Sequence, residues 1–89
     1  MRRVKVLIKG KVHGVFFRAH IEQKAKSLRI TGYVKNVPEG IEAVFEGSDE
    51  KVKDMLEFCA IGPKEAKVTC IEIQEEPYQG ECDGFMGED

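Results

Sequence analysis

The sequence predicts an α+β domain in which two helices pack on one face of an antiparallel sheet. Four stretches read as strands, by alternating apolar residues or by their content of β-forming residues, and two stretches have apolar residues at helical spacing. Their order is strand, helix, strand, strand, helix, strand. A length of 89 residues suits one small domain with a single core. We therefore expect one domain over residues 1–89.

The first strand is expected over residues 3–9, where three apolar residues alternate with mostly basic ones: Val4, Val6 and Ile8. A helix over roughly residues 18–29 follows, because four apolar residues recur at helical spacing: Phe17, Ile21, Ala25 and Leu28. The spacing of apolar residues changes from that of a strand to that of a helix within a short segment that contains glycine. We therefore expect the strand to lead through a loop directly into the helix.

A hairpin is expected in the middle of the chain. Residues 31–37 are rich in β-forming residues and read as the second strand, and residues 41–46 read as the third. Between them, Val37-Pro38-Glu39-Gly40 is typical of a tight turn, because proline presets one dihedral angle and glycine tolerates a positive one. The two strands are therefore expected to be antiparallel neighbours.

The second half of the chain supplies the other helix and a further strand. Ser48 is expected to cap a helix that ends at Gly62-Pro63 and turns one apolar face inward: Val52, Met55, Leu56 and Cys59. The next strand begins near Ala66, and its apolar residues change parity between Cys70 and Ile71, which indicates a bulge. This element order is a split βαβ, or ferredoxin-like, arrangement.

The tail after Glu75 is acidic and contains glycine. Its only anchoring residues are Tyr78, Phe85 and Met86, so we expect any strand there to be short or frayed.

Composition narrows the protein's class and location. The chain is 42% hydrophobic and 34% charged, as in soluble globular proteins, and no apolar run approaches the roughly 20 residues of a membrane span. The first residues lack a secretory apolar segment, so we expect the protein to be cytoplasmic. We also expect it to be a monomer.

Cysteines 59, 70 and 82 are too widely spaced for a metal site and are expected to be free thiols, with Cys59 and Cys70 in or near the core.

Charge is distributed unevenly along the chain. Residues 1–35 contain ten basic side chains and one acid, whereas residues 36–89 contain four basic side chains and fifteen acids. A positive segment would attract anions. Alternatively, the two signs interleave in the folded molecule and largely cancel.

The segment from Gly10 to Arg18 has the features of an anion-binding loop. Its glycines allow a sharp turn and close approach of backbone N–H groups to a ligand. The helix that begins just beyond it adds further donors and a partial positive charge. Arg18, in the first helical turn, offers a planar fork that matches phosphate oxygens. The sequence therefore predicts a phosphate-binding loop.

Three ordered blocks of the sequence resemble the acylphosphatase family. They read Gly-Lys-Val-His-Gly-Val-Phe-Phe-Arg at 10–18, Gly-Tyr-Val-Lys-Asn at 32–36 and Gly-Pro-Lys-Glu-Ala-Lys-Val at 62–68. The resemblance covers about residues 4–73. It implies a hydrolase that cleaves carboxyl (acyl) phosphates, small-molecule substrates, into a carboxylate and inorganic phosphate without metal or other cofactor.

The resemblance also implies which residues form the site. Arg18 would bind the phosphoryl group together with the backbone N–H groups of the loop, and Asn36 would position the attacking water. The substrate-binding residues implied are His13, Gly14, Val15, Phe16, Phe17 and Arg18. His13 stands where the family usually has Gln; we expect it to stabilise the loop, whereas an imidazole titrating beside the phosphate would make activity depend on pH.

Other readings of the same residues are weighed against this one. Phe17 falls on the inward stripe of the helix, and we expect both Phe16 and Phe17 to be core or loop anchors rather than stacking platforms for a nucleobase. A binding module for RNA is the main alternative, but the middle strands lack its aromatic pattern, so no nucleic acid is expected. A domain that binds phosphate or carbamoyl phosphate without catalysis is another. Nothing in the sequence shapes a pocket for the acyl group, which predicts broad specificity.

Overall fold

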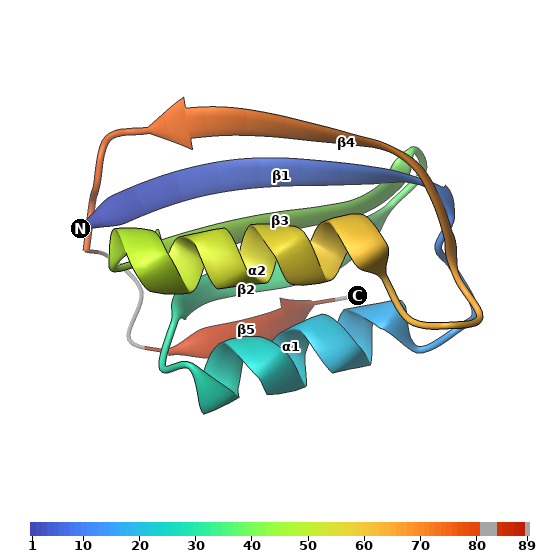
Figure 1. Ribbon diagram of the computed structural model, residues 1–89, viewed down its shortest axis with the longest axis horizontal. Helices are drawn as coiled ribbons and strands as arrows, with labels where there is room; N and C mark the ends of the chain where they lie inside the picture. The colour runs from blue at the N-terminus through green and yellow to red at the C-terminus, as the bar shows by residue number, and fades with distance from the viewer. Residues whose placement is uncertain (81–83, 89) are drawn as a thin grey trace.

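The computed structural model describes residues 1–80 and 84–88 and contains one sheet with both helices on one of its faces (Figure 1). The elements are, in chain order, β1 (Arg2–Lys11), α1 (Phe17–Ser27), β2 (Thr31–Val37), β3 (Gly40–Gly47), α2 (Asp49–Ile61), β4 (Lys67–Glu76) and β5 (Phe85–Glu88). The predicted β-α-β-β-α-β order is confirmed, with β5 added after it.

The sheet has the strand order β4-β1-β3-β2-β5. The first four strands pair in antiparallel fashion, and the β2–β3 hairpin closes at Val37 and Gly40 around a two-residue loop, as the turn signal predicts. β5 differs because it runs parallel to β2, with Gly32 opposite Phe85 and Lys35 opposite Glu88. The sheet is therefore mixed rather than purely antiparallel, since the chain crosses to the far edge before forming β5.

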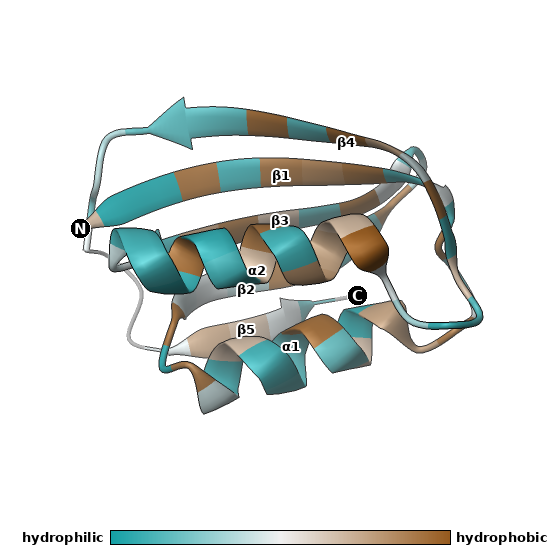
Figure 2. Ribbon diagram, in the orientation of Figure 1, coloured by the Kyte–Doolittle hydropathy of each residue, from teal (hydrophilic) through white to brown (hydrophobic). Residues whose placement is uncertain are grey.

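The core lies between the helices and the sheet. Apolar and polar residues alternate along β1 and around both helices (Figure 2). Each helix contributes three buried residues to the core: Phe17, Ile21 and Ala25 from α1, and Val52, Met55 and Cys59 from α2. Phe85 of β5 stacks on Phe45 of β3 with ring centroids 5.7 Å apart, so the short last strand is anchored in the core.

Local chemistry explains both ends of α2 and the early end of α1. The hydroxyl of Ser48 accepts a hydrogen bond from Lys51 N at 3.3 Å, as expected of an N-cap, and Gly62 (φ 72°) ends the helix. The first helix ends two residues earlier than predicted, because Arg29 adopts a left-handed conformation (φ 57°). The hydrogen bonds from Arg29 N to Lys26 O and from Ile30 N to Ala25 O form a Schellman motif there.

The predicted irregularity of β4 lies one to two residues earlier than expected. Lys9 of β1 pairs with Cys70 while Gly10 pairs with Val68, so Thr69 is the extra, bulged residue. As a result, Val68 before the bulge and Ile71 after it both pack against the core, whereas Cys70 is exposed. The prediction that Cys70 lies in or near the core is therefore wrong, while Cys59 is buried as predicted.

Basic residues of the first half pair with acids of the second half across the sheet. Arg2 contacts Glu75 at 2.6 Å, Lys9 contacts Glu72 at 2.9 Å, and Lys5 and Lys35 both approach Glu42. The uneven charge distribution along the chain thus becomes an interleaved one in space, which was the alternative left open by the sequence.

One acid of the sheet is buried. The side chain of Glu46 lies 3.1 Å from Arg3 and accepts hydrogen bonds from the backbone N–H groups of Gln79 and Gly80 at 2.9 and 3.2 Å. Burial by itself would raise the pKa of Glu46, but these donors and the Arg3 guanidinium outweigh it and lower that pKa. Glu46 therefore attaches the segment after β4 to the end of β3.

Candidate active site

A pocket of about 230 Å³ lies where the β1–α1 loop meets the end of β2. It is lined by Val12, Gly14, Phe16, Phe17, Arg18, Ala19 and Asn36. In Figure 1 this loop lies at the opposite end of the molecule from the N-terminus. The two residues proposed for catalysis, Arg18 and Asn36, line the same pocket although they come from different elements.

Strand periodicity brings Asn36 to this pocket. Side chains two residues apart in a strand point to the same face, and Val34 of β2 is buried beneath the helices. Asn36 follows on that face at the exposed end of β2. Since α1 packs against β2, the face on which Asn36 lies is turned toward the first turn of α1, where Arg18 is half-buried.

Apolar side chains hold the loop from below. Val12 and Phe17 are buried and Val15 packs against the core, so the two ends and the middle of the loop are fixed. Between them Gly14 has φ 75°, and a Cβ built there would meet no described atom within 4 Å. The backbone at Gly14 thus borders open space at the pocket, which is what the approach of a ligand to backbone N–H groups requires.

The N-terminus of α1 faces the same site without a capping side chain. Its N-cap residue is Phe16, whose side chain makes no cap hydrogen bond, and the first turn contains no acid. The first intrahelical bond runs from His20 N to Phe16 O at 3.1 Å. The preceding N–H groups therefore lack intrahelical acceptors, and the helix end favours an anion.

His13 is directed away from the pocket and toward the β2–β3 hairpin. Its Nε2 lies 2.6 Å from the carbonyl oxygen of Gly40, and because a carbonyl only accepts, Nε2 is the donor. Gly40 has φ 152°, and a Cβ there would lie 1.9 Å from the carbonyl oxygen of Ile8. The hydrogen bond from His13 to Gly40 connects the loop to the first residue of β3. His13 is not among the described residues that line the pocket.

Arg18 has a partner that the sequence did not indicate. Its Nη1 donates a hydrogen bond to the backbone carbonyl oxygen of Glu88 in β5 at 2.5 Å. The two residues are 70 positions apart, and only the parallel pairing of β5 with β2 brings them together. A backbone acceptor leaves no side-chain signature, so sequence reasoning had nothing by which to find it.

The two adjacent phenylalanines have opposite environments. Phe17 is 1% exposed and belongs to the core, as predicted. Phe16 is 79% exposed, so the prediction that both are anchors is wrong for this residue. The helix starts with Phe17 directed inward, and the left-handed backbone of Phe16 (φ 58°, ψ 21°) directs its ring to the rim of the pocket.

Residues 1–80 and 84–88 contain no group of three or more His, Cys, Asp or Glu side chains placed to hold a metal ion. None of the helices in this part of the chain is long and apolar enough to cross a bilayer. What the pocket offers is a guanidinium, a side-chain amide and a turn of backbone beside an uncapped helix end. This set of groups can bind a phosphoryl group and orient a water molecule.

Comparison with known proteins places the chain in one family. The acylphosphatase family model matches residues 4–86. An acylphosphatase of Syntrophus aciditrophicus is 46% identical over 86 residues, which cover 96% of this chain and 90% of that protein. Another, from Syntrophobacter fumaroxidans, is 48% identical over 81 residues, covering 90% of this chain and 84% of that protein.

Solved structures agree with the sequence comparisons. The crystal structure of acylphosphatase from Bacillus subtilis superposes with a TM-score of 0.93 at 27% identity and covers the whole of both chains. An acylphosphatase from Coxiella burnetii superposes with a TM-score of 0.90 at 32% identity, covering 98% of this chain and 92% of that one. Family model, relatives and fold thus coincide over nearly the whole chain, and the protein belongs to the acylphosphatase family of acyl-phosphate hydrolases.

Proposed function

We propose that the pocket between the β1–α1 loop and β2 is where this enzyme hydrolyses carboxyl phosphates. Backbone N–H groups of residues 13–17 and the guanidinium of Arg18 hold the phosphoryl group, and the amide of Asn36 positions the attacking water. The observation on which the proposal depends is that Arg18 and Asn36 line one pocket beside the turn at Gly14.

The leaving group explains why so few side chains suffice. A carboxylic acid has a pKa near ~4, so the carboxylate departs without being protonated and no general acid is required. The phosphorus–oxygen bond to the acyl group breaks with its electron pair on the carboxylate. The water oxygen forms the new bond to phosphorus, and both protons of that water leave with the inorganic phosphate. Phosphoryl transfer of this kind depends mainly on positioning and on neutralising the phosphoryl oxygens.

Arg18 and the backbone donors supply that neutralisation. Preorganised N–H groups stabilise developing charge at little cost of reorganisation, because loop and helix already hold them in place. The hydrogen bond from Arg18 to Glu88 O orients the guanidinium plane from the side of β5. Asn36 accepts a hydrogen bond from the water through its amide oxygen without placing a negative charge beside the phosphate.

The open face of the sheet favours this reading over an RNA-binding module. That face presents the acids Glu42 and Glu76 among its basic residues, and the hydroxyl of Tyr33 donates to Glu42 at 3.0 Å. A phosphate backbone would meet these carboxylates instead of unpaired cations. We therefore propose that the protein binds no nucleic acid. We also propose that residues 1–89 form one domain and that the enzyme is a cytoplasmic monomer that acts on a small acyl phosphate.

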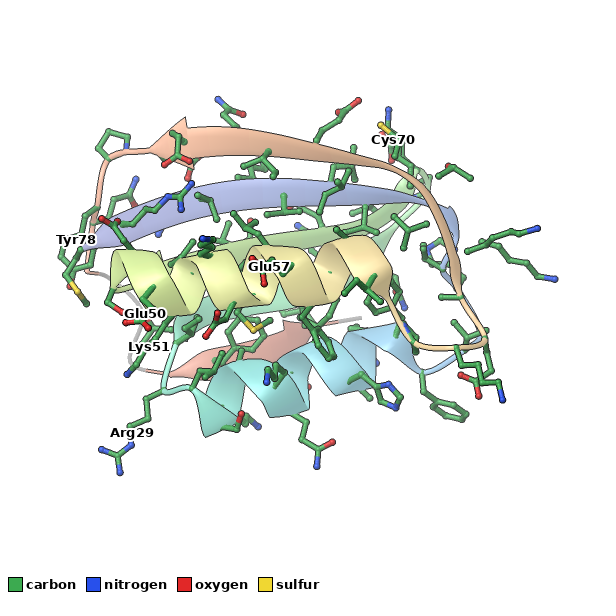
Figure 3. All side chains as sticks on the ribbon, in the orientation of Figure 1. Arg29, Glu50, Lys51, Glu57, Cys70 and Tyr78 are labelled. Carbon is green, nitrogen blue, oxygen red and sulfur yellow. The ribbon has the colours of Figure 1, made fainter. Side chains whose placement is uncertain are left out.

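Benzoyl phosphate hydrolysis in the presence of a chelator tests the site. Arg18→Ala and Asn36→Ala are each expected to lower kcat/KM by about 10²–10³-fold, the usual cost of removing a preorganised group. Arg29→Ala is the matched control for Arg18, because Arg29 lies at the other end of α1 and points away from the protein (Figure 3).

Circular dichroism should show that all variants remain folded. Folded wild type that is inert, or activity that survives both substitutions, would contradict the proposal. Activity that disappears with chelator and returns with a metal ion would contradict the cofactor-free mechanism.

A further inference from the structure

The rim of the pocket carries an exposed aromatic ring at a strained backbone position. Phe16 is the N-cap residue of α1 and has φ 58° and ψ 21°. A left-handed backbone is unfavourable for a bulky side chain, and glycine would adopt it without penalty. Residues that keep such a conformation are concentrated at functional sites.

Burial does not compensate for this strain. Phe16 is 79% exposed, whereas the next residue, Phe17, is 1% exposed and belongs to the core. Exposed aromatic rings beside a ligand pocket are suited to cover apolar parts of a ligand. Phe17 therefore stabilises the fold, whereas the exposed ring of Phe16 is available to a ligand.

The surroundings of Phe16 give the pocket a polar and an apolar side. Arg18, Asn36 and the backbone at Gly14 offer groups for the phosphoryl end of a substrate, and Phe16, Val12 and Ala19 add apolar surface. With its phosphoryl group bound by Arg18 and the loop backbone, a substrate would extend its acyl group toward the opening of the pocket. The ring of Phe16 lies at that opening.

We infer that Phe16 determines specificity for the acyl group and favours acyl phosphates with an aromatic or extended apolar acyl chain. This inference rests on the proposed phosphoryl site. It replaces the expectation of broad specificity, which followed from a sequence that showed no acyl pocket. The ring contacts the acyl group in the ground state and the transition state alike, so its effect falls on KM more than on kcat.

The test compares two substrates within each variant. Replacing the ring in Phe16→Ala is expected to reduce the preference for benzoyl over acetyl phosphate, taken as the ratio of KM values, by about threefold to tenfold. Phe16→Tyr keeps the ring and should keep the preference. Tyr78→Ala removes an exposed aromatic residue at the other end of the molecule (Figure 3) and should keep it too.

Binding of phosphonates separates this inference from the proposed function. Calorimetry should give wild type a tighter Kd for phenylphosphonate than for methylphosphonate, and that margin should shrink in Phe16→Ala even if no variant hydrolyses anything. An inert wild type with the margin intact would refute the hydrolysis proposal alone. A preference or a margin that is unchanged in Phe16→Ala would overturn the role of Phe16 and leave the hydrolysis proposal standing.

Discussion

The two described cysteines differ in the properties that control thiol reactivity. Cys59 is buried in α2, and burial raises the pKa of its thiol to about 12. Cys70 lies on the edge strand β4 and is exposed, and its side chain points outward (Figure 3). Because the thiolate is the reactive form, a buried neutral thiol is inert while an exposed one is modified.

Iodoacetamide is therefore expected to modify native protein at Cys70 and to spare Cys59 until the protein unfolds. Peptide mapping by mass spectrometry assigns each site and separates Cys82, which lies outside the described residues. Equal modification of Cys59 and Cys70 in the native state would show that the helix layer opens much more readily than its packing indicates.

At the scale of single elements, α1 begins and ends at residues with a left-handed backbone. Phe16 precedes it with φ 58°, and Arg29 follows it with φ 57°. The Schellman hydrogen bonds explain Arg29, since the residue after a helix usually adopts this conformation to satisfy the last carbonyl groups. No side-chain cap hydrogen bond explains the conformation of Phe16, and this residue lines the pocket.

Arg29→Gly is expected to raise the free energy of unfolding by up to about 1 kcal/mol, because glycine removes the left-handed strain while adding some unfolded-state entropy. Urea denaturation at pH 7 measures it. Phe16→Gly should give a gain of similar size but also lose the acyl preference, which Arg29→Gly should retain. Destabilisation by Arg29→Gly would mean that the arginine side chain holds the helix end.

The elements that the sequence predicted correctly are those set by local chemistry. Residues 31–37 and 49–61 have the expected bounds because Pro38 and Gly40 define one hairpin and Ser48 and Gly62 define one helix. β5 was not predicted as a parallel strand, since its four residues find their place only through pairing with β2.

For the site, the sequence named Arg18 from the glycine loop and helix start before it, and Asn36 from the family resemblance. Both line one pocket, and their catalytic roles stay predictions. The partner of Arg18 and the exposure of the Phe16 ring could not be predicted, because they depend on a distant strand and on one backbone conformation.

At the scale of the whole molecule, Glu46 ties the segment after β4 to the paired strands β1 and β3. It contacts Arg3 from β1 and the backbone of Gln79 and Gly80 in the connection to β5. The pKa of Glu46 is lowered in the folded protein, because these donors outweigh the effect of burial. Its charged form thus stabilises the fold above its ordinary pKa of 4.5, and this contribution is lost as pH falls through the lowered folded-state value.

Glu46→Gln is expected to reduce the free energy of unfolding at pH 7 by about 1–3 kcal/mol, the usual worth of hydrogen bonds to a charged group. The variant should also lose less stability than wild type between pH 5 and the acid limit. Urea midpoints measured across that range report both effects. The control is Glu75→Gln: the hydrogen bond from Arg2 lowers the pKa of Glu75 as well, but solvent screens this exposed pair, so its pH profile should depart from wild type much less than that of Glu46→Gln.

The hydrogen bond between Arg18 and the carbonyl of Glu88 has a consequence for synthesis and handling of the protein. Seventy positions separate the two residues, so a ribosome makes the arginine long before it makes the backbone that orients it. The loop can fold early, yet the hydrogen bond from its guanidinium to Glu88 O forms after β5 has docked. An affinity tag fused after β5 would emerge beside the pocket, whereas one fused before Met1 would lie at the far end of the molecule (Figure 1).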